Sequence, residues 1–200
     1  WKLRLNSKIQ SIYKNIYNTD ELITSLDGFS FFFSKKQKTK RWHHIDQNPS
    51  NTILSYQGSY NYFKVSDDDA GFVVAPKSHI GFNPSVTHQR DWIMVDPSIN
   101  WNEQVVKLKI PENCFTLWNS KLIHANTAMV KNITELNRLT CYVTFLPAGL
   151  QTDSNRCNRI NAYKNSKTCS HWANRCELKK YPFGFKKQHE NKNLFKIQPL

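Results

Sequence analysis

The chain has 200 residues, of which 39% are apolar and 13% aromatic, enough to bury the core of one folded domain. This composition excludes a disordered chain, and no apolar run reaches the roughly eighteen residues that a membrane-spanning helix needs. The formal net charge of +13 predicts a basic surface that attracts anions such as nucleic acid, phosphorylated metabolites or acidic lipids. A solvated, lysine-rich face would give the same composition without any such partner.

Residues 7–26 carry apolar side chains at helical spacing. We expect two helices here, with Thr19 and Asp20 as the cap between them. An N-terminal helical part is therefore predicted over about residues 1–30.

Short apolar or alternating segments follow, separated by turn residues such as Asn48-Pro49-Ser50. They read FSFFF, TILSYQG, YNYFKV, GFVVAP, DWIMV, QVVKLKI, CFTLW, LIHA and RLTCYVTFL. Many short strands between turns predict an antiparallel β-sandwich or barrel, which we place at residues 31–150.

The last quarter of the chain, residues 151–200, is polar and has eleven Lys and Arg against three acidic residues. We expect an irregular or helical extension packed on the barrel, within a single domain of residues 1–200. A second basic cluster runs from Lys35 to Arg41. Because aromatic residues are interleaved with the lysines of the tail, both basic segments are candidate nucleic-acid contacts.

The chain has five cysteines, and an odd number in a chain of this size favours free thiols and an intracellular, cytoplasmic setting. It begins at Trp1 and not at methionine, which is compatible with a fragment that lacks a targeting segment. Four residues could form a Cys3His zinc site, although their spacing matches no standard zinc motif and free thiols are the alternative. They are Cys157, Cys169, His171 and Cys176.

A candidate metal site begins in RWHHIDQNP, where His44 and Asp46 are two residues apart. Side chains at i and i+2 of a strand point to the same face, so both could reach one ion. His124, in the strand-like segment LIHA, would complete a set of two imidazoles and one carboxylate. This is the ligand set of non-haem Fe(II) oxygenases, which leaves coordination positions open. Taken singly, each residue is more simply a half-buried, hydrogen-bonded side chain.

Arg138 stands inside the apolar segment NRLTCYVTF, where an unpaired charge is costly. A guanidinium in a pocket suits a two-pronged grip on a carboxylate. We expect a hairpin from His124 through KNITELN that brings the strand of Arg138 alongside that of His124.

Five segments in this order resemble the phytanoyl-CoA dioxygenase-like family of Fe(II)/2-oxoglutarate-dependent oxygenases. They are WHHIDQNP, YQG, DDDAGFVVAPKSHIGF, LWNSKLIHAN and NRLTCYVTFLPA, and the resemblance covers about residues 20–175. It implies a mainly β (α+β) fold, a double-stranded β-helix or jelly-roll barrel with N-terminal helices and an irregular basic C-terminal extension.

The resemblance also implies roles for single residues. His44, Asp46 and His124 match the metal ligands and hence the catalytic centre, and Arg138 matches the residue that pairs with the distal carboxylate of 2-oxoglutarate. Two further residues match hydrogen-bonding partners of the cosubstrate: Gln57 and Asn126. The implied cofactors are Fe(II), 2-oxoglutarate as cosubstrate, and O2.

The segment from Gly71 to His79 matches a family motif, G-x-x-x-x-P-G-S-H, with Lys77 where the family prefers glycine. Glycine tolerates positive φ and lysine resists it, so the loop conformation is the part that the resemblance does not predict. We expect His79 to be structural and not a fourth ligand.

The implied function is hydroxylation of a small, anionic organic substrate by a 2-oxoglutarate-dependent oxygenase. The anionic character follows from Lys35–Arg41, which leads into the metal site. Two alternatives stay open: a 2-oxoglutarate oxygenase that acts on nucleic acid, and a non-catalytic basic barrel that binds nucleic acid.

Overall fold

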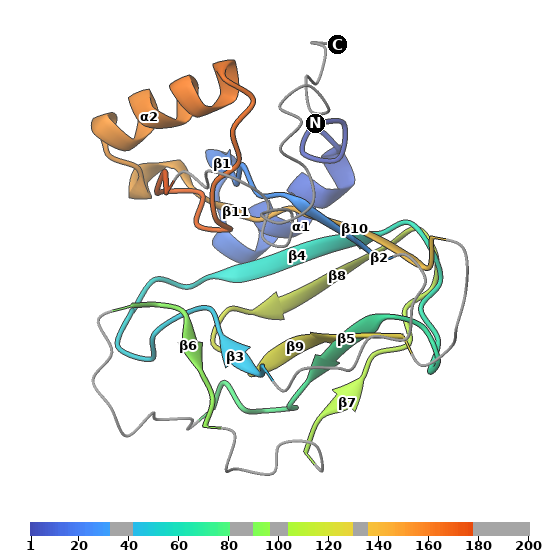
Figure 1. The fold of residues 1–200 in the computed structure, drawn as a ribbon. Coiled ribbons are helices and arrows are strands. Elements are labelled where there is room, and N and C mark those ends of the chain that lie inside the picture. The colour runs from blue at the N-terminus through green and yellow to red at the C-terminus, as the bar shows by residue number, and fades with distance from the viewer. Residues whose placement is uncertain (33–41, 81–89, 97–103, 130–135, 178–200) are drawn as a thin grey trace, which may run out of the picture. The chain divides into compact units, whose positions relative to one another are not determined.

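A computed structural model of the chain describes residues 1–32, 42–80, 90–96, 104–129 and 136–177 (Figure 1). The chain forms two compact units, one made of Trp1–Gly28 and Val143–Leu200 and the other of Phe29–Tyr142. All strand pairs of the described residues are antiparallel, as predicted. Within the same residues, no helix is both long and apolar enough to cross a membrane. The single-domain organisation stays a prediction.

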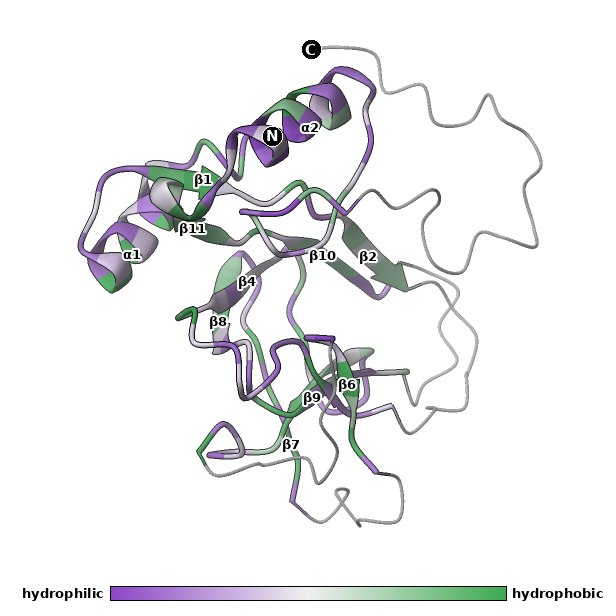
Figure 2. Ribbon diagram, turned by 90° about the vertical axis from the view of Figure 1, so that its left-hand side faces the viewer, coloured by the Kyte–Doolittle hydropathy of each residue, from purple (hydrophilic) through white to green (hydrophobic). Residues whose placement is uncertain are grey.

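The first unit begins with helix α1, Ser7–Tyr17. The side chain of Asn6 accepts hydrogen bonds from the first turn, and Asn18 ends the helix in the left-handed conformation at φ 50°. The helix buries Ile9 and Tyr13 and exposes its polar side chains, so both hydrophilic and hydrophobic colours lie on it (Figure 2). The Tyr13 hydroxyl donates to the carbonyl of Val143, which ties the helix to the second half of this unit.

The second N-terminal helix was a wrong prediction. Residues Leu22–Thr24 form strand β1, which pairs with β11, Phe145–Pro147, in a two-stranded sheet. Helical periodicity is a weak guide over seven residues, and a partner strand far along the chain satisfies the backbone groups instead. The left-handed Asn18 has already turned the chain away from the helix axis.

The rest of the first unit contains a short 3-10 helix, Ala148–Leu150, and helix α2, Asp153–Lys164, capped by Thr152. Leu26, Ala162 and Cys169 form a buried hydrophobic cluster of this unit. The predicted helical or irregular extension is therefore helical over α2 and irregular from there to residue 177. Residues 178–200 lie outside the described part.

The second unit contains two antiparallel sheets (Figure 1). The four-stranded sheet has the order β2 (Phe29–Phe32), β10 (Arg138–Tyr142), β4 (Tyr56–Asn61) and β8 (Cys114–Asn119). The five-stranded sheet has the order β6 (Ile93–Met94), β3 (His44–Ile45), β9 (His124–Thr127), β5 (Gly71–Val74) and β7 (Val106–Lys107).

The predicted hairpin between His124 and Arg138 does not form. Strand β9 pairs with β3 and β5, whereas β10 pairs with β2 and β4 in the other sheet. The two side chains still belong to one site, because Arg138 reaches across to Asn126 on β9. The prediction that Arg138 lies near the strand of His124 was therefore right, but the predicted pairing of their two strands was wrong.

One face of β4 is buried and polar. Gln57, Ser59 and Asn61 alternate along the strand and all three are at most 5% exposed. A buried sheet face is ordinarily apolar, because polar side chains must find partners once they leave water. A polar inner face therefore indicates a site for a polar ligand, not a simple core.

The loop after β5 explains how the departure at Lys77 is accommodated. Lys77 adopts φ 64°, the left-handed conformation that the family's glycine would take without strain. Its neighbour Ser78 accepts a hydrogen bond from the backbone N–H of Ile123 at 2.8 Å. The loop therefore keeps its turn and supports the start of β9, directly before His124.

Because Lys77 is exposed and left-handed, Lys77→Gly should stabilise the protein. Relief of the left-handed strain, worth about 1–2 kcal/mol, exceeds the entropic cost of glycine, so we expect a net gain of about 0.5–1 kcal/mol. Denaturant unfolding of the apo protein measures it. Lys77→Ala is the matched control, since it removes the side chain but keeps the strain, and a gain equal to that of glycine would contradict this explanation.

Candidate metal centre

Three side chains meet in the second unit: His44 on β3, Asp46 just after it, and His124 on β9. They offer two imidazole nitrogens and one carboxylate oxygen that all lie within 4.8 Å of one another. Asp46 Oδ2 is 3.1 Å from His124 Nε2, and Asp46 Oδ1 is 3.8 Å from His44 Nε2. Adjacent ligands about 2.1 Å from one octahedral ion lie about 3 Å apart, so the Asp46–His124 distance fits a shared cation and the Asp46–His44 distance is somewhat wider.

The two histidines present the same nitrogen to the centre. His44 Nδ1 is 2.9 Å from the carbonyl of Trp42, and His124 Nδ1 is 2.8 Å from the carbonyl of Leu122. A carbonyl can only accept, so each Nδ1 carries a proton, and in the neutral ring each Nε2 then keeps its lone pair for a metal ion. Backbone partners of this kind fix the tautomer and the ring orientation of metal-binding histidines.

Strand pairing brings these histidines together. His44 is the cross-strand partner of His124 in the β3–β9 register, and their ring centroids are 4.4 Å apart. Their side chains are only 7% and 6% exposed, and that of Asp46 is 14% exposed. The site is therefore largely shielded from water while one edge stays accessible.

Gln57 binds the carboxylate of Asp46. Its Nε2 donates to Asp46 Oδ2 at 2.9 Å, from the opposite sheet. The sequence had placed Gln57 beside the cosubstrate, and that role stays a prediction. In the described geometry the amide orients Asp46, which is how outer partners keep a ligand in place.

Gln57→Met should weaken Fe(II) binding about tenfold, because the shape is kept but the hydrogen bond to Asp46 is lost. Anaerobic metal titration measures the change in affinity. Ser59→Ala, two residues along the same face of β4, is the matched control and should bind iron as the wild type does. Equal affinities for Fe(II) in the wild type and both variants would show that the Gln57 amide does not influence metal binding by Asp46.

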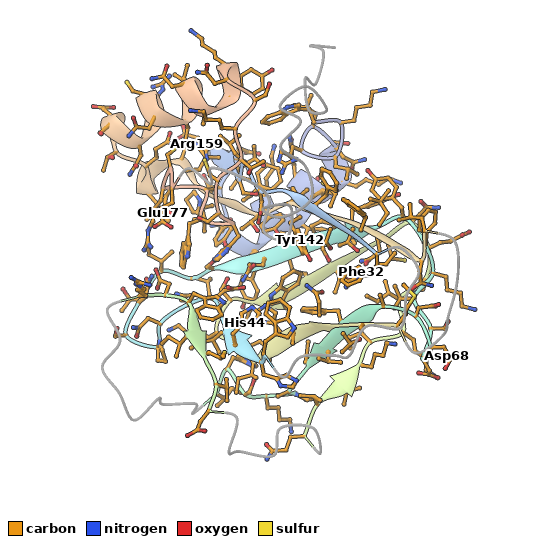
Figure 3. All side chains as sticks on the ribbon, in the orientation of Figure 1. Phe32, His44, Asp68, Tyr142, Arg159 and Glu177 are labelled. Atoms are coloured by element: carbon orange, nitrogen blue, oxygen red, sulfur yellow. The ribbon has the colours of Figure 1, made fainter. Side chains whose placement is uncertain are left out.

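The site has two centres: the His-Asp-His cluster and the buried guanidinium of Arg138. Arg138 is 2% exposed, donates from Nη1 to the carbonyl of Gly71 and to Asn126 Oδ1, and donates from Nε to Thr140 Oγ1. The guanidinium also lies over the ring of Phe32, 5.6 Å from its centroid. Figure 3 shows Phe32 and Tyr142 on the four-stranded sheet and His44 on the other.

No acidic side chain of the described residues forms an ion pair with Arg138. Burial lowers the pKa of its guanidinium, and Tyr142 opposes part of that shift. A buried ion without a counter-charge costs several kcal/mol even after relaxation. An anionic ligand would supply the missing charge.

Asn126 joins the two centres. It is two residues beyond His124 on β9, its Oδ1 accepts from Arg138 at 2.8 Å, and its Nδ2 is 3.3 Å from the Tyr142 hydroxyl. Its predicted contact with the cosubstrate stays a prediction. Its contact with Arg138 places that guanidinium relative to the metal ligands.

Sequence reasoning missed the aromatic side chains around the triad. Trp42 and Trp92 lie 4.8 Å and 5.6 Å from His44, and Trp118 lies 5.7 Å from His124, between ring centroids. Trp42 also donates its indole N–H to the Asn126 carbonyl at 2.9 Å. Trp42 stands two residues before His44 in the sequence, so its position on the same strand face was the one available clue.

The other residues that the sequence analysis considered are His79, the possible zinc ligands and the two basic segments. His79 is exposed and lies outside the His-Asp-His cluster, and its structural role stays a prediction. Of the possible zinc ligands, Cys169 and Cys176 lie with their sulfurs 3.4 Å apart while Cys157 is exposed, and the triad is the only metal-type cluster among the described residues. Lys35–Arg41 and residues 178–200 lie outside the described part, and the nucleic-acid contacts stay a prediction.

Comparison with known proteins gives the fold a context. No protein-family model matches the sequence. The Ava biosynthesis cluster protein O of Aspergillus versicolor is 24% identical over an alignment 145 residues long, which covers 62% of this chain and 47% of that protein. The chain thus spans about half the length of the curated relative that it matches.

Two solved structures share its architecture. The epimerase SnoN, in complex with Fe3+, alpha ketoglutarate and nogalamycin RO, superposes with a TM-score of 0.51 at 12% identity, over 74% of this chain and 58% of SnoN. HygX from Streptomyces hygroscopicus, with nickel and 2-oxoglutarate bound, gives 0.51 at 15% identity, over 74% of this chain and 66% of HygX. The chain has their fold.

Proposed function

We propose that this chain is an Fe(II)- and 2-oxoglutarate-dependent oxygenase of the phytanoyl-CoA dioxygenase-like type, with a jelly-roll barrel, that hydroxylates a small organic molecule. The observation that carries the proposal is the pairing of two centres in one buried site. A His-Asp-His set with its lone pairs converging stands beside a buried guanidinium that has no carboxylate partner among the described residues. Either centre alone would have simpler explanations.

The donor set fits the metal. Two neutral imidazole nitrogens and one carboxylate oxygen suit Fe(II) and leave coordination positions for other ligands, whereas thiolates would favour zinc. His44, Asp46 and His124 would hold the ion, and Gln57 would keep the carboxylate oriented. When bound, iron and 2-oxoglutarate together supply O2-dependent oxidation of a C–H bond, coupled to release of succinate and CO2.

The chain's own part is to bind, orient and shield. Arg138 would bind the far carboxylate of 2-oxoglutarate through a charge-assisted, two-pronged contact. Asn126 and Thr140 hold the guanidinium in place for that contact. Phe72 and Trp118 pack against each other, 4.8 Å between ring centroids, and keep water from the wall behind His124.

The substrate is a small molecule in this proposal, and the SnoN structure also contains one, nogalamycin RO. Its anionic character rests on Lys35–Arg41, outside the described residues, and stays a prediction. No observation in the described residues favours nucleic acid as substrate or partner.

The test is an anaerobic titration of the apo protein with Fe(II) and then 2-oxoglutarate. We expect a weak visible charge-transfer band that saturates at one equivalent per chain, and then, in air, release of succinate. A protein that binds Fe(II) but shows neither the band nor succinate would overturn the proposed function.

A further inference from the structure

The indole N–H of Trp118 is a buried hydrogen-bond donor with no acceptor among the described residues. Trp118 lies on β8 and is 6% exposed. An indole nitrogen donates but does not accept, so the group needs an acceptor atom. Buried donors in native proteins are nearly always satisfied, so this one needs a partner from outside the described residues, such as a water molecule, an ion or a ligand.

The strand register places this donor at the metal end of the site. Trp118 is directly opposite Gln57 in the β4–β8 pair, and Gln57 donates to Asp46. Cross-strand partners point to the same face of a sheet. The other end of the same face is marked by Asn61, which pairs with Thr140 beside Arg138.

The contacts of the ring agree with this placement. Its centroid is 5.7 Å from that of His124 and 4.8 Å from that of Phe72. Phe72, Val74 and Trp118 form one buried cluster, so the surroundings of the indole are largely apolar. In such surroundings a hydrogen bond to a charged oxygen is stronger than it would be in water.

We propose that the Trp118 N–H donates a hydrogen bond to the carboxylate of 2-oxoglutarate that lies at the metal end of the site. This inference rests on the proposed function and adds a ligand-binding residue that the sequence did not indicate. The two carboxylates of the cosubstrate would then be recognised from two strands, by Trp118 on β8 and by Arg138 on β10.

The first test is the affinity of the Fe(II)-loaded protein for 2-oxoglutarate, measured anaerobically by the charge-transfer band. Trp118→Phe keeps an aromatic ring and removes the donor, so its Kd for 2-oxoglutarate should rise about tenfold while its affinity for Fe(II) stays unchanged. Trp172→Phe, a buried tryptophan of the first unit, is the matched control and should bind 2-oxoglutarate as the wild type does. Equal Kd values for all three proteins would overturn the proposal.

The second test does not require the variant to fold. In the wild-type protein loaded with diamagnetic Zn(II), the Trp118 indole proton should move downfield in a 15N–1H spectrum when 2-oxoglutarate is added, and the Trp172 indole should not. A buried water that already satisfies the N–H would leave the resonance unmoved at saturating 2-oxoglutarate, which overturns the inference. If no 2-oxoglutarate binds to the wild type at all, it is the proposed function that fails.

Discussion

Asp46→Ala is expected to lose Fe(II) binding and to release succinate from 2-oxoglutarate at least about 1,000-fold more slowly than the wild type. The carboxylate is the only anionic ligand of the cluster, and both of its oxygens face the two imidazoles. Loss of an outer partner typically costs 10–100-fold in metal affinity or activity, so loss of a ligand itself should cost more. His44→Ala should behave in the same way.

The measurements are metal content after anaerobic loading and succinate release without added substrate. Asp20→Ala is a suitable control, because Asp20 is 89% exposed and pairs with Lys14 at the surface, where such pairs contribute little. It should keep full metal content and turnover. Undiminished succinate formation in Asp46→Ala or His44→Ala would remove the metal assignment.

Arg138→Met should weaken 2-oxoglutarate binding at least about 100-fold while leaving Fe(II) binding intact. The replacement keeps a long side chain and removes the positive charge that we propose to bind the far carboxylate. Its effect on the apo protein should be small, about 1–2 kcal/mol or less, because the desolvation cost of the guanidinium disappears together with its hydrogen bonds. A severe loss of apo stability would instead indicate a structural arginine.

Ligand-induced stabilisation gives a second readout for the same residue. At 2-oxoglutarate concentrations of about 100 times Kd, the Fe(II)-loaded wild type should gain about 2.7 kcal/mol, a rise in Tm of about 5–10 °C. Arg138→Met should show no such rise, and Arg138→Lys, which keeps the charge but not the fork, should show a reduced one. Lys109→Met is the control, since Lys109 forms an exposed ion pair with Asp67 and should keep the full ligand effect.

The predicted ligands meet because their sequence pattern is local or lies on regular strands. His44 and Asp46 are two apart along an extended segment, so a shared direction follows from strand geometry alone. His124 required only that its strand lie nearby, and the β3–β9 pairing supplies this. The motif-like segment Gly71–His79 was likewise local, and Lys77 adopts the left-handed φ that glycine takes without strain.

Predictions that depended on long-range pairing were less accurate. The expected hairpin put His124 and Arg138 on neighbouring strands, whereas they lie in different sheets and meet through Asn126. The expected second helix is a strand, β1, which pairs with β11. This pairing was not predicted because the partner strand lies more than a hundred residues away in the sequence. Apolar periodicity reports which side chains avoid water and does not report which strand satisfies the backbone.

The sequence by itself determined the strand-rich body, the candidate metal ligands and the buried arginine, Arg138, because residue type and local spacing set which faces are buried and which atoms can bind an ion. Only the tertiary structure decided which strands pair, that Gln57 donates a hydrogen bond to Asp46, and that backbone carbonyls hold both histidines by Nδ1. It alone showed that the indole N–H of Trp118 has no acceptor among the described residues. These contacts join segments far apart in the chain, and only the folded arrangement brings their atoms within hydrogen-bond range.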